Sequence, residues 1–247
     1  MQCSDEGIVL SVRQHGETAA VVELLTRENG RHLGLVHGGR SRRLRPTLQI
    51  GNHVDAVWTG RLAEHLGQFK VELRRGYAAG AMSDAASLEA LSSIATLTRL
   101  LAEREPHPNL YEITQFVLGF IDDDSVWPAL LVRWELALLE ELGFGLELGA
   151  CAVTGENDAL IYVSPKTGRA VSASAGEEYH DRLLHLPQFL RPGRQGGISM
   201  EDVAAGFKLT GHFFEQRVFF PRGETLPDVR LRLIGLLDRK RERSLTG

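Results

Sequence analysis

The sequence predicts an α+β protein in which a small β-barrel or sandwich precedes a mostly helical domain. Three observations support this. Five short strand-like segments lie within residues 1–75, a switch toward Ala and Leu follows at residues 76–83, and apolar residues then recur at helical spacing almost to the end. We therefore expect a β domain at residues 1–80 and a helical domain at residues 81–247.

The five predicted strands either alternate apolar and polar residues or are rich in β-branched residues and leucine. We expect them at residues 7–13, 19–26, 30–37, 52–59 and 68–74. Asn29 and Gly30 mark the hairpin turn between the second and third strands, because this pair adopts positive φ at little cost. Short strands spaced by turns in this way are typical of a small barrel or sandwich.

Capping and stop signals bound the predicted helices. Ser83 and Asp84 predict the start of a helix that runs to Arg104, and a second helix is expected from Asn109. A third is expected to begin at Trp127 and to end before Gly143. Later helices are expected near residues 176–186, 199–220 and 226–243, and a small β-hairpin insert at about residues 149–175.

The last predicted helix carries six cations, namely Arg230, Arg232, Arg239, Lys240, Arg241 and Arg243. Cations near the C-terminus of a helix interact favourably with the helix dipole. We therefore interpret this run as a solvated helix end, with an anion-binding tail as the alternative.

The segment with the clearest functional signal is a loop in which four arginines fall within six residues. They are Arg40, Arg42, Arg43 and Arg45, and they follow Gly38 and Gly39. A guanidinium stays charged and needs water or an anion, and closely spaced guanidinium groups suit a phosphate backbone. No Gly-Lys-Ser/Thr follows, so the loop is not a Walker A motif. It predicts binding of a nucleic-acid backbone with weak sequence preference, against the alternative of a surface loop without a partner.

The distribution of charge supports the same prediction. The chain has a net charge of −4, yet residues 1–80 carry 11 Lys+Arg against 8 Asp+Glu, a balance of +3, which leaves −7 for the remainder. A basic N-terminal domain in an otherwise acidic chain favours attraction of an anionic partner to that domain. Three further cations of the β domain are candidate neighbours of the loop: Arg31, Arg61 and Arg74. Trp58 is either a base-stacking residue or part of the core.

The sequence offers little support for an enzyme or a metal protein. A structural zinc ion needs four Cys or His ligands. In a Cys-x-x-Cys zinc knuckle the second ligand lies three residues after the first, and three residues after Cys151 this chain has Thr154. Cys151 also lacks a nearby base that would make it a nucleophile, so we interpret it as a buried, unreactive residue. We expect no catalytic residues, no cofactor and no metal.

The composition is that of a globular protein without a membrane span. No apolar run reaches about 18 residues, and the first residues lack the pattern of a secretory signal. Two cysteines are too few for a disulfide framework. We expect a cytoplasmic, nucleoid-associated protein with no membrane partner.

The ordered set of segments resembles the bacterial RecO family of DNA repair proteins. In the first half, the resemblance lies in residues 6–10, 16–18, 25–30, 38–43 and 48–51. In the second half, it lies in residues 133–139, residues 142–144 and Cys151. The first half includes the whole Gly-Gly-Arg-Ser-Arg-Arg run, and the matching segments extend over nearly the entire chain.

The resemblance implies an N-terminal OB-fold followed by a helical domain. It also implies a recombination mediator that binds single- and double-stranded DNA, anneals complementary strands, and loads RecA onto strands coated by single-strand binding protein. RecR and, in many bacteria, RecF would be its partners. Many members of the family hold zinc with four cysteines at the insert, whereas this chain has Thr154, Ser172 and Ser174 beside Cys151. We therefore expect a zinc-finger-like insert that lacks the zinc ligands.

The resemblance further implies that the helical domain binds the acidic C-terminal tail of single-strand binding protein. An arginine beside an apolar groove suits a terminal carboxylate and a Phe anchor. Arg133 matches a family position for this role, with a plain helix-surface arginine as the alternative.

Three other classes of function stay open on the residues alone. A protein-interaction adaptor would use the barrel to bind a protein instead of DNA. An RNA-binding OB-fold protein would prefer RNA through contacts to the 2′-OH. An enzyme with a site dispersed over the fold would show turnover that one conservative substitution abolishes.

Overall fold

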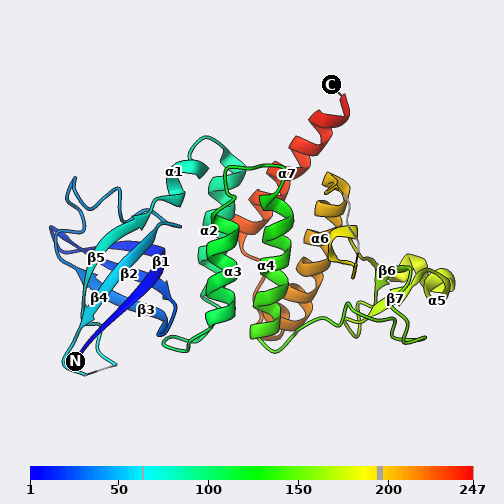
Figure 1. The fold of residues 1–247 in the computed structure, drawn as a ribbon, viewed down its shortest axis with the longest axis horizontal. Coiled ribbons are helices and arrows are strands. Elements are labelled where there is room, and N and C mark those ends of the chain that lie inside the picture. Colours follow the sequence, from blue (N-terminus) through cyan, green and yellow to red (C-terminus); the bar gives the residue numbers. More distant parts are fainter. Residues whose placement is uncertain (63, 194–196, 247) are drawn as a thin grey trace. The chain divides into compact units, whose positions relative to one another are not determined.

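The computed structural model describes residues 1–62, 64–193 and 197–246, with side chains to Arg243. The chain divides into two compact units, Met1–Asp122 and Asp123–Gly247. The first unit contains a five-stranded barrel with three helices, and the second is helical with a small sheet (Figure 1). The predicted α+β fold class is confirmed.

The barrel is built from five strands in the order β1-β2-β3-β5-β4, and β1 closes it by pairing with β4. The strands are β1 (Gln2–His15), β2 (Ala19–Thr26), β3 (Gly30–Val36), β4 (His53–Thr59) and β5 (Gln68–Arg75). All neighbours are antiparallel except β3 and β5, which meet in parallel. This is the OB-fold arrangement expected from the resemblance.

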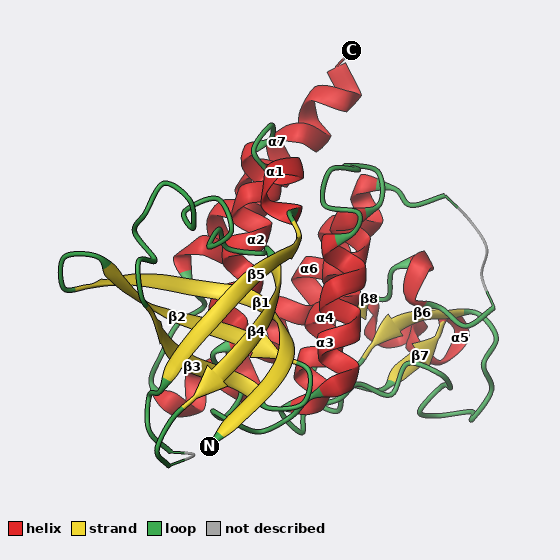
Figure 2. Cartoon of the chain, turned by 60° about the vertical axis from the view of Figure 1, so that its left-hand side comes forward, coloured by secondary structure: helices red, strands yellow, loops and turns green. Residues whose placement is uncertain are grey.

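Strand β1 begins five residues before its predicted start because it pairs with two neighbouring strands. Its first half pairs with β4 as far as Ile8, and its second half pairs with β2 from Gly7 to His15. A bulge between Val9 and Ser11, within the part paired with β2 and just beyond the end of the β4 pairing, bends the strand. Beyond Ile8, β1 therefore has a strand neighbour on one side only, at the β1–β2 hairpin visible in Figure 2.

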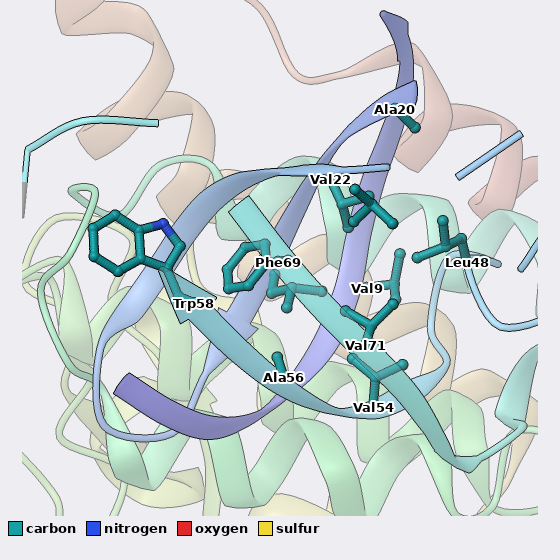
Figure 3. Close-up of a cluster of buried hydrophobic side chains, with 11 residues drawn as sticks. Val9, Ala20, Val22, Leu48, Val54, Ala56, Trp58, Phe69 and Val71 are labelled. Atoms are coloured by element: carbon teal, nitrogen blue, oxygen red, sulfur yellow. The ribbon is translucent and has the colours of Figure 1, made fainter. Parts of the chain in front are cut away.

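Alternating residues of the strands fill the barrel with alanine, valine and leucine side chains and two aromatic rings, those of Trp58 and Phe69, as Figure 3 shows. Trp58 belongs to this core: 3% of its surface is exposed, and its indole N–H donates to the carbonyl of Leu66 at 3.0 Å. Leu48, from the loop between β3 and β4, packs into the same cluster. Of the two interpretations of Trp58, the structure supports the core one.

Three helices complete the first unit: α1 (Tyr77–Ala81), α2 (Ala85–Thr98) and α3 (Pro108–Leu118). The Asp84 side chain caps α2 by accepting from the Ser87 amide at 2.8 Å, as predicted. Helix α2 ends at Thr98, six residues short of the predicted Arg104. The chain turns there because the Arg104 amide donates to the Arg31 carbonyl at 2.8 Å, along the edge of β3.

The buried carboxylate of Glu23 ties this turn to the barrel. It accepts from Ser11 within the sheet and pairs with Arg31 at 2.5 Å and with Arg99 at 3.1 Å. Arg31 also donates to the carbonyl of Leu101. Arg31, which the sequence presented as a candidate neighbour of the DNA site, is thus an internal tie between β3 and the end of α2.

The second unit contains three long helices and a small sheet. The helices are α4 (Trp127–Glu141), α6 (Met200–Phe213) and α7 (Asp228–Thr246). The sheet, in the order β7-β6-β8, is formed by β6 (Leu160–Val163), β7 (Ala170–Ser172) and β8 (Leu184–His185). Among the described residues, no helix is long and apolar enough to span a membrane.

Two predictions for this unit are wrong in detail. In place of a helix at residues 176–186, the chain forms α5 (Ala173–Gly176), a 3-10 turn (Glu177–Arg182) and β8, because residues 184 and 185 pair with β6. Arg230 is not part of a solvated helix end: its side chain is 1% exposed and forms a bidentate pair with Glu135, which is 0% exposed. Helix α6 continues through a π-helical turn (Phe214–Phe219) and a 3-10 turn (Phe220–Arg222), close to the predicted helix at residues 199–220.

Candidate nucleic-acid interface

The arginine-rich loop lies between β3 and β4 and is anchored to the barrel at its C-terminal end. The Gly51 amide donates to the Val9 carbonyl at 2.8 Å, and the Val9 amide donates to the Asn52 carbonyl at 2.9 Å. The buried side chain of Asn52 donates to the carbonyls of Pro46 and Thr47 and accepts from the Ala78 amide. The end of the loop is thus hydrogen-bonded to β1 at Val9, next to Ile8, where the pairing between β1 and β4 stops.

Two glycines make the N-terminal attachment possible. Gly38 has a φ of +66°, which residues with a side chain rarely adopt. A Cβ on Gly39 would lie 2.9 Å from the Cβ of Ala20 on β2, so the backbone can approach β2 this closely only without a side chain. The next residue is joined to the β1–β2 turn, because the Arg40 amide donates to the Thr18 carbonyl at 3.2 Å.

The middle of the loop is turned in a helical manner. The amides of Arg45 and Leu48 donate to the carbonyls of Ser41 and Leu44, each at 3.0 Å. This i to i+4 spacing places Leu44 and Leu48 on one side, where both pack against the barrel core. Arg42, Arg43 and Arg45, which alternate with these anchored positions, are exposed.

Three of the four loop arginines are exposed and have no side-chain hydrogen bond or ion pair within the described part of the chain: Arg42, Arg43 and Arg45. Arg40 is different, because its guanidinium donates to the carbonyls of Glu17 at 2.7 Å and Gly16 at 3.4 Å. Arg40 therefore fastens the loop to the β1–β2 turn, and the other three present their charge to solvent.

The remaining sequence candidates have different surroundings. Arg74 on β5 is half exposed and pairs with Glu6 at 2.6 Å and Asp55 at 3.0 Å, so its charge is neutralised within the barrel. Arg61 is exposed beyond the end of β4, where it lines an open hollow of about 610 Å³ together with His65 and Gln68. Neither Arg61 nor Arg74 lines the groove beside the loop described next.

Between the β1–β2 hairpin and the loop runs a groove of about 370 Å³. Its lining residues are Val12, Gln14, Ala20, Gly39, Arg40, Arg45, Leu48 and Gln49. Sequence reasoning missed the contribution of β1, including Gln14 and the exposed Arg13 and His15 at the end of the strand. The polar run before the turn at residues 16–18 was the available signal, but only the barrel topology places it beside the arginine loop.

The small sheet of the second unit does not offer a zinc site. The Cys151 thiol lies 3.5 Å from the Ser172 hydroxyl oxygen and accepts from the Ser172 amide at 3.3 Å. Burial raises the pKa of this thiol, but hydrogen bonds from Ser172 and Thr154 outweigh burial and lower it to about 6. Hydroxyl groups are not the Cys or His ligands that structural zinc takes, and no cluster of three ligating side chains occurs among the described residues. The residues present do not fit a zinc ion.

Arg133 is an exposed residue of α4, and the two residues that follow it, Trp134 and Glu135, are buried. Its guanidinium donates to the carbonyl of Phe189. An open groove of about 430 Å³ lies elsewhere in this unit, between α6 and α7, and its lining includes Phe207, Lys208 and Leu231 but not Arg133.

Comparison with known proteins covers both units. The family model for the recombination protein O N-terminal region matches residues 1–77, and the model for its C-terminal region matches residues 82–225. A protein of Methylorubrum populi named DNA repair protein RecO is 53% identical over 241 residues, which cover 96% of this chain and 98% of that protein. A protein of the same name from Rhodopseudomonas palustris is 50% identical over 246 residues, which cover 98% of both chains. The chain belongs to the recombination protein O family.

Proposed function

We propose that this chain acts in DNA repair by homologous recombination and that its barrel binds DNA through the backbone phosphates. The observation that carries the proposal is a group of three exposed guanidinium groups, without an ion pair in the described part of the chain, on a loop anchored at both ends. Arginines held this close together repel one another, and a chain of phosphates relieves that repulsion. None of the three needs to contact a base edge, so little sequence preference is expected.

This arrangement also suits the annealing of complementary strands. Two single strands repel each other through their phosphates, and cations that neutralise one strand lower the barrier to approach by the other. The same electrostatic attraction acts on duplex DNA. The proposed activity therefore needs no nucleotide hydrolysis and no catalytic residue.

Binding of single-stranded DNA across a salt series tests the proposal. Replacing Arg42, Arg43 and Arg45 with Gln removes three phosphate contacts, which flattens the slope of log K against log salt by about 2. A matched control changes three exposed cations of the second unit, Lys166, Arg182 and Arg222, and alters the net charge by the same amount.

Equal binding by both variants and the unaltered protein would refute the assignment of the loop and favour a protein-interaction adaptor. A clear preference for RNA over DNA of equal length would favour the RNA-binding alternative. Annealing of two complementary strands, followed by fluorescence quenching, should slow with the loop variant and not with the control.

For the helical unit, we propose contact with the C-terminal tail of single-strand binding protein through Arg133, and with RecR, in the loading of RecA. RecF is a further proposed partner. The exposed guanidinium of Arg133 has five N–H donors and, with the Phe189 carbonyl as its described acceptor, can still bind a carboxylate. Arg133→Gln should weaken binding of the tail peptide about tenfold, equivalent to about 1.4 kcal/mol. The same variant should anneal bare DNA strands normally and fail only on strands coated by single-strand binding protein. Unchanged binding of the tail peptide would show that Arg133 does not have this role.

A further inference from the structure

The groove between the β1–β2 hairpin and the arginine loop has a chemistry that phosphate binding alone does not explain. Its walls include three apolar side chains, those of Val12, Ala20 and Leu48. Polar groups are also present: the amide of Gln14, the amide of Gln49 and the guanidinium of Arg45. A site for phosphates only would have no use for the apolar part, because a phosphate gains nothing from contact with methyl groups.

We propose that this groove holds one unstacked nucleotide of a bound single strand, with its base on the apolar wall and its phosphate on Arg45. The inference rests on the proposed DNA binding and adds the class of ligand that the groove takes. Its volume of about 370 Å³ is in the range of small-ligand sites. A paired base stays within its stack and cannot enter, so the groove favours single strands over duplex DNA.

The hydrogen bonds of the free protein leave suitable groups for the edge of a base. Gln49 lines the groove and donates its amide nitrogen to the Arg45 carbonyl at 2.8 Å, and its amide oxygen has no donor among the described residues. No partner occurs for the Gln14 amide within the described residues, and this side chain offers both a donor and an acceptor. Two amides with this freedom can bind any of the four bases, which is consistent with weak sequence preference.

The groove is held open by contacts that do not depend on DNA. Arg40 bridges to the carbonyls of Gly16 and Glu17, which joins the loop to the turn of the hairpin. At the other end, Leu48 is anchored in the barrel core with 5% of its surface exposed. A preformed site of this kind binds without first having to order its walls.

The test compares an oligothymidylate with a strand of the same length in which every nucleotide is abasic. Both strands carry the same phosphates, so the difference in their affinities measures the contribution of the bases. We expect the unaltered protein to bind the oligothymidylate about tenfold more tightly. Equal affinities would overturn the inference and leave the phosphate-binding proposal standing.

Val12→Phe provides the variant that tests the groove itself. Val12 is 37% exposed, so a larger side chain here fills the groove without crowding the core. Binding of the oligothymidylate should fall to the level of the abasic strand, with unchanged salt dependence and unchanged duplex binding. Val153→Phe, at a position that is 72% exposed on the second unit, is the matched control.

Gln14→Ala is a second, gentler variant, and it should lower the same base-dependent affinity without affecting the abasic strand. If Val12→Phe leaves the ratio of the two affinities unchanged, the bases are held elsewhere and the inference is wrong. If the unaltered protein binds neither strand nor duplex, the proposed function fails together with the inference.

Discussion

The buried ion pair between Glu135 and Arg230 is expected to govern the stability of the second unit. Arg230 donates to the two carboxylate oxygens of Glu135 at 2.8 and 2.9 Å, and also to the Phe207 carbonyl and the Thr210 hydroxyl. The Thr210 hydroxyl donates to the same carboxylate. The pair joins α4 to α7, and Phe207 and Thr210 on α6 complete its surroundings.

The magnitude follows from the burial of both partners. Arg230→Met leaves the carboxylate of Glu135 without its counter-charge at a position that is 0% exposed. Removing one member of a buried pair costs about 3–5 kcal/mol. Replacing both, as in Glu135→Leu with Arg230→Met, leaves no buried charge and should recover at least about 2 kcal/mol of that loss.

Urea unfolding followed by tryptophan fluorescence measures these free energies. Trp127 and Trp134 are fully buried in the second unit and report its unfolding. Arg169→Met is the control, because its partner Glu147 is 74% exposed and surface pairs of this kind contribute about 0–1 kcal/mol. A loss below about 1 kcal/mol for Arg230→Met, or a double variant no more stable than the single one, would refute the reasoning.

Three further predictions concern the first unit. Burial and, secondarily, the charge of Arg104 lower the pKa of His32 to about 4, below the usual value near 6.5, so the unfolded chain takes up the proton first. The contribution of neutral His32 to the free energy of unfolding should therefore be fully present above pH 6.5 and fall by on the order of 3 kcal/mol as the pH drops to 4. Urea titrations at several pH values should show that His32→Leu removes this part of the pH dependence. Arg40→Ala should speed amide hydrogen exchange at residue 40, whose amide donates to the Thr18 carbonyl, and across residues 38–45 in the DNA-free protein, and unchanged exchange would show that the Arg40 side chain does not fasten the loop. Glu23→Gln should destabilise the unit by about 2–3 kcal/mol in thermal unfolding, because Arg31 loses its counter-charge, whereas Ser11→Ala should cost about 1 kcal/mol.

Local patterns were sufficient to predict most elements. Alternation, or a high content of β-branched residues and leucine, located all five strands of the barrel, and the Trp-Pro start with the Gly stop bounded α4 within two residues. The arginine loop was correctly predicted to be a surface loop, because its four guanidinium groups cannot be packed in a core. Where prediction failed, a tertiary partner decided the outcome: residues 184 and 185 became a strand because β6 lies beside them.

Pairing between distant charges was the part that the sequence could not supply. Arg230 looked like one of six solvated cations, yet its partner Glu135 lies 95 residues away. Arg31 looked like an extension of the basic loop, and its partner Glu23 stands across a hairpin on the neighbouring strand. Composition counts charges and gives no information on which of them are already neutralised.

This distinction changes how the charge of the first unit bears on its function. Arg31 and Arg74 are matched by Glu23, Glu6 and Asp55, so they add little to the field outside the barrel. Arg42, Arg43 and Arg45, which have no ion pair among the described residues, lie together on the loop, beside a groove with apolar and amide-bearing walls. A local concentration of this kind attracts a polyanion to one place, even on a chain whose net charge is −4. The attraction carries no sequence information, and a groove that admits only an unpaired base would convert it into a preference for single strands.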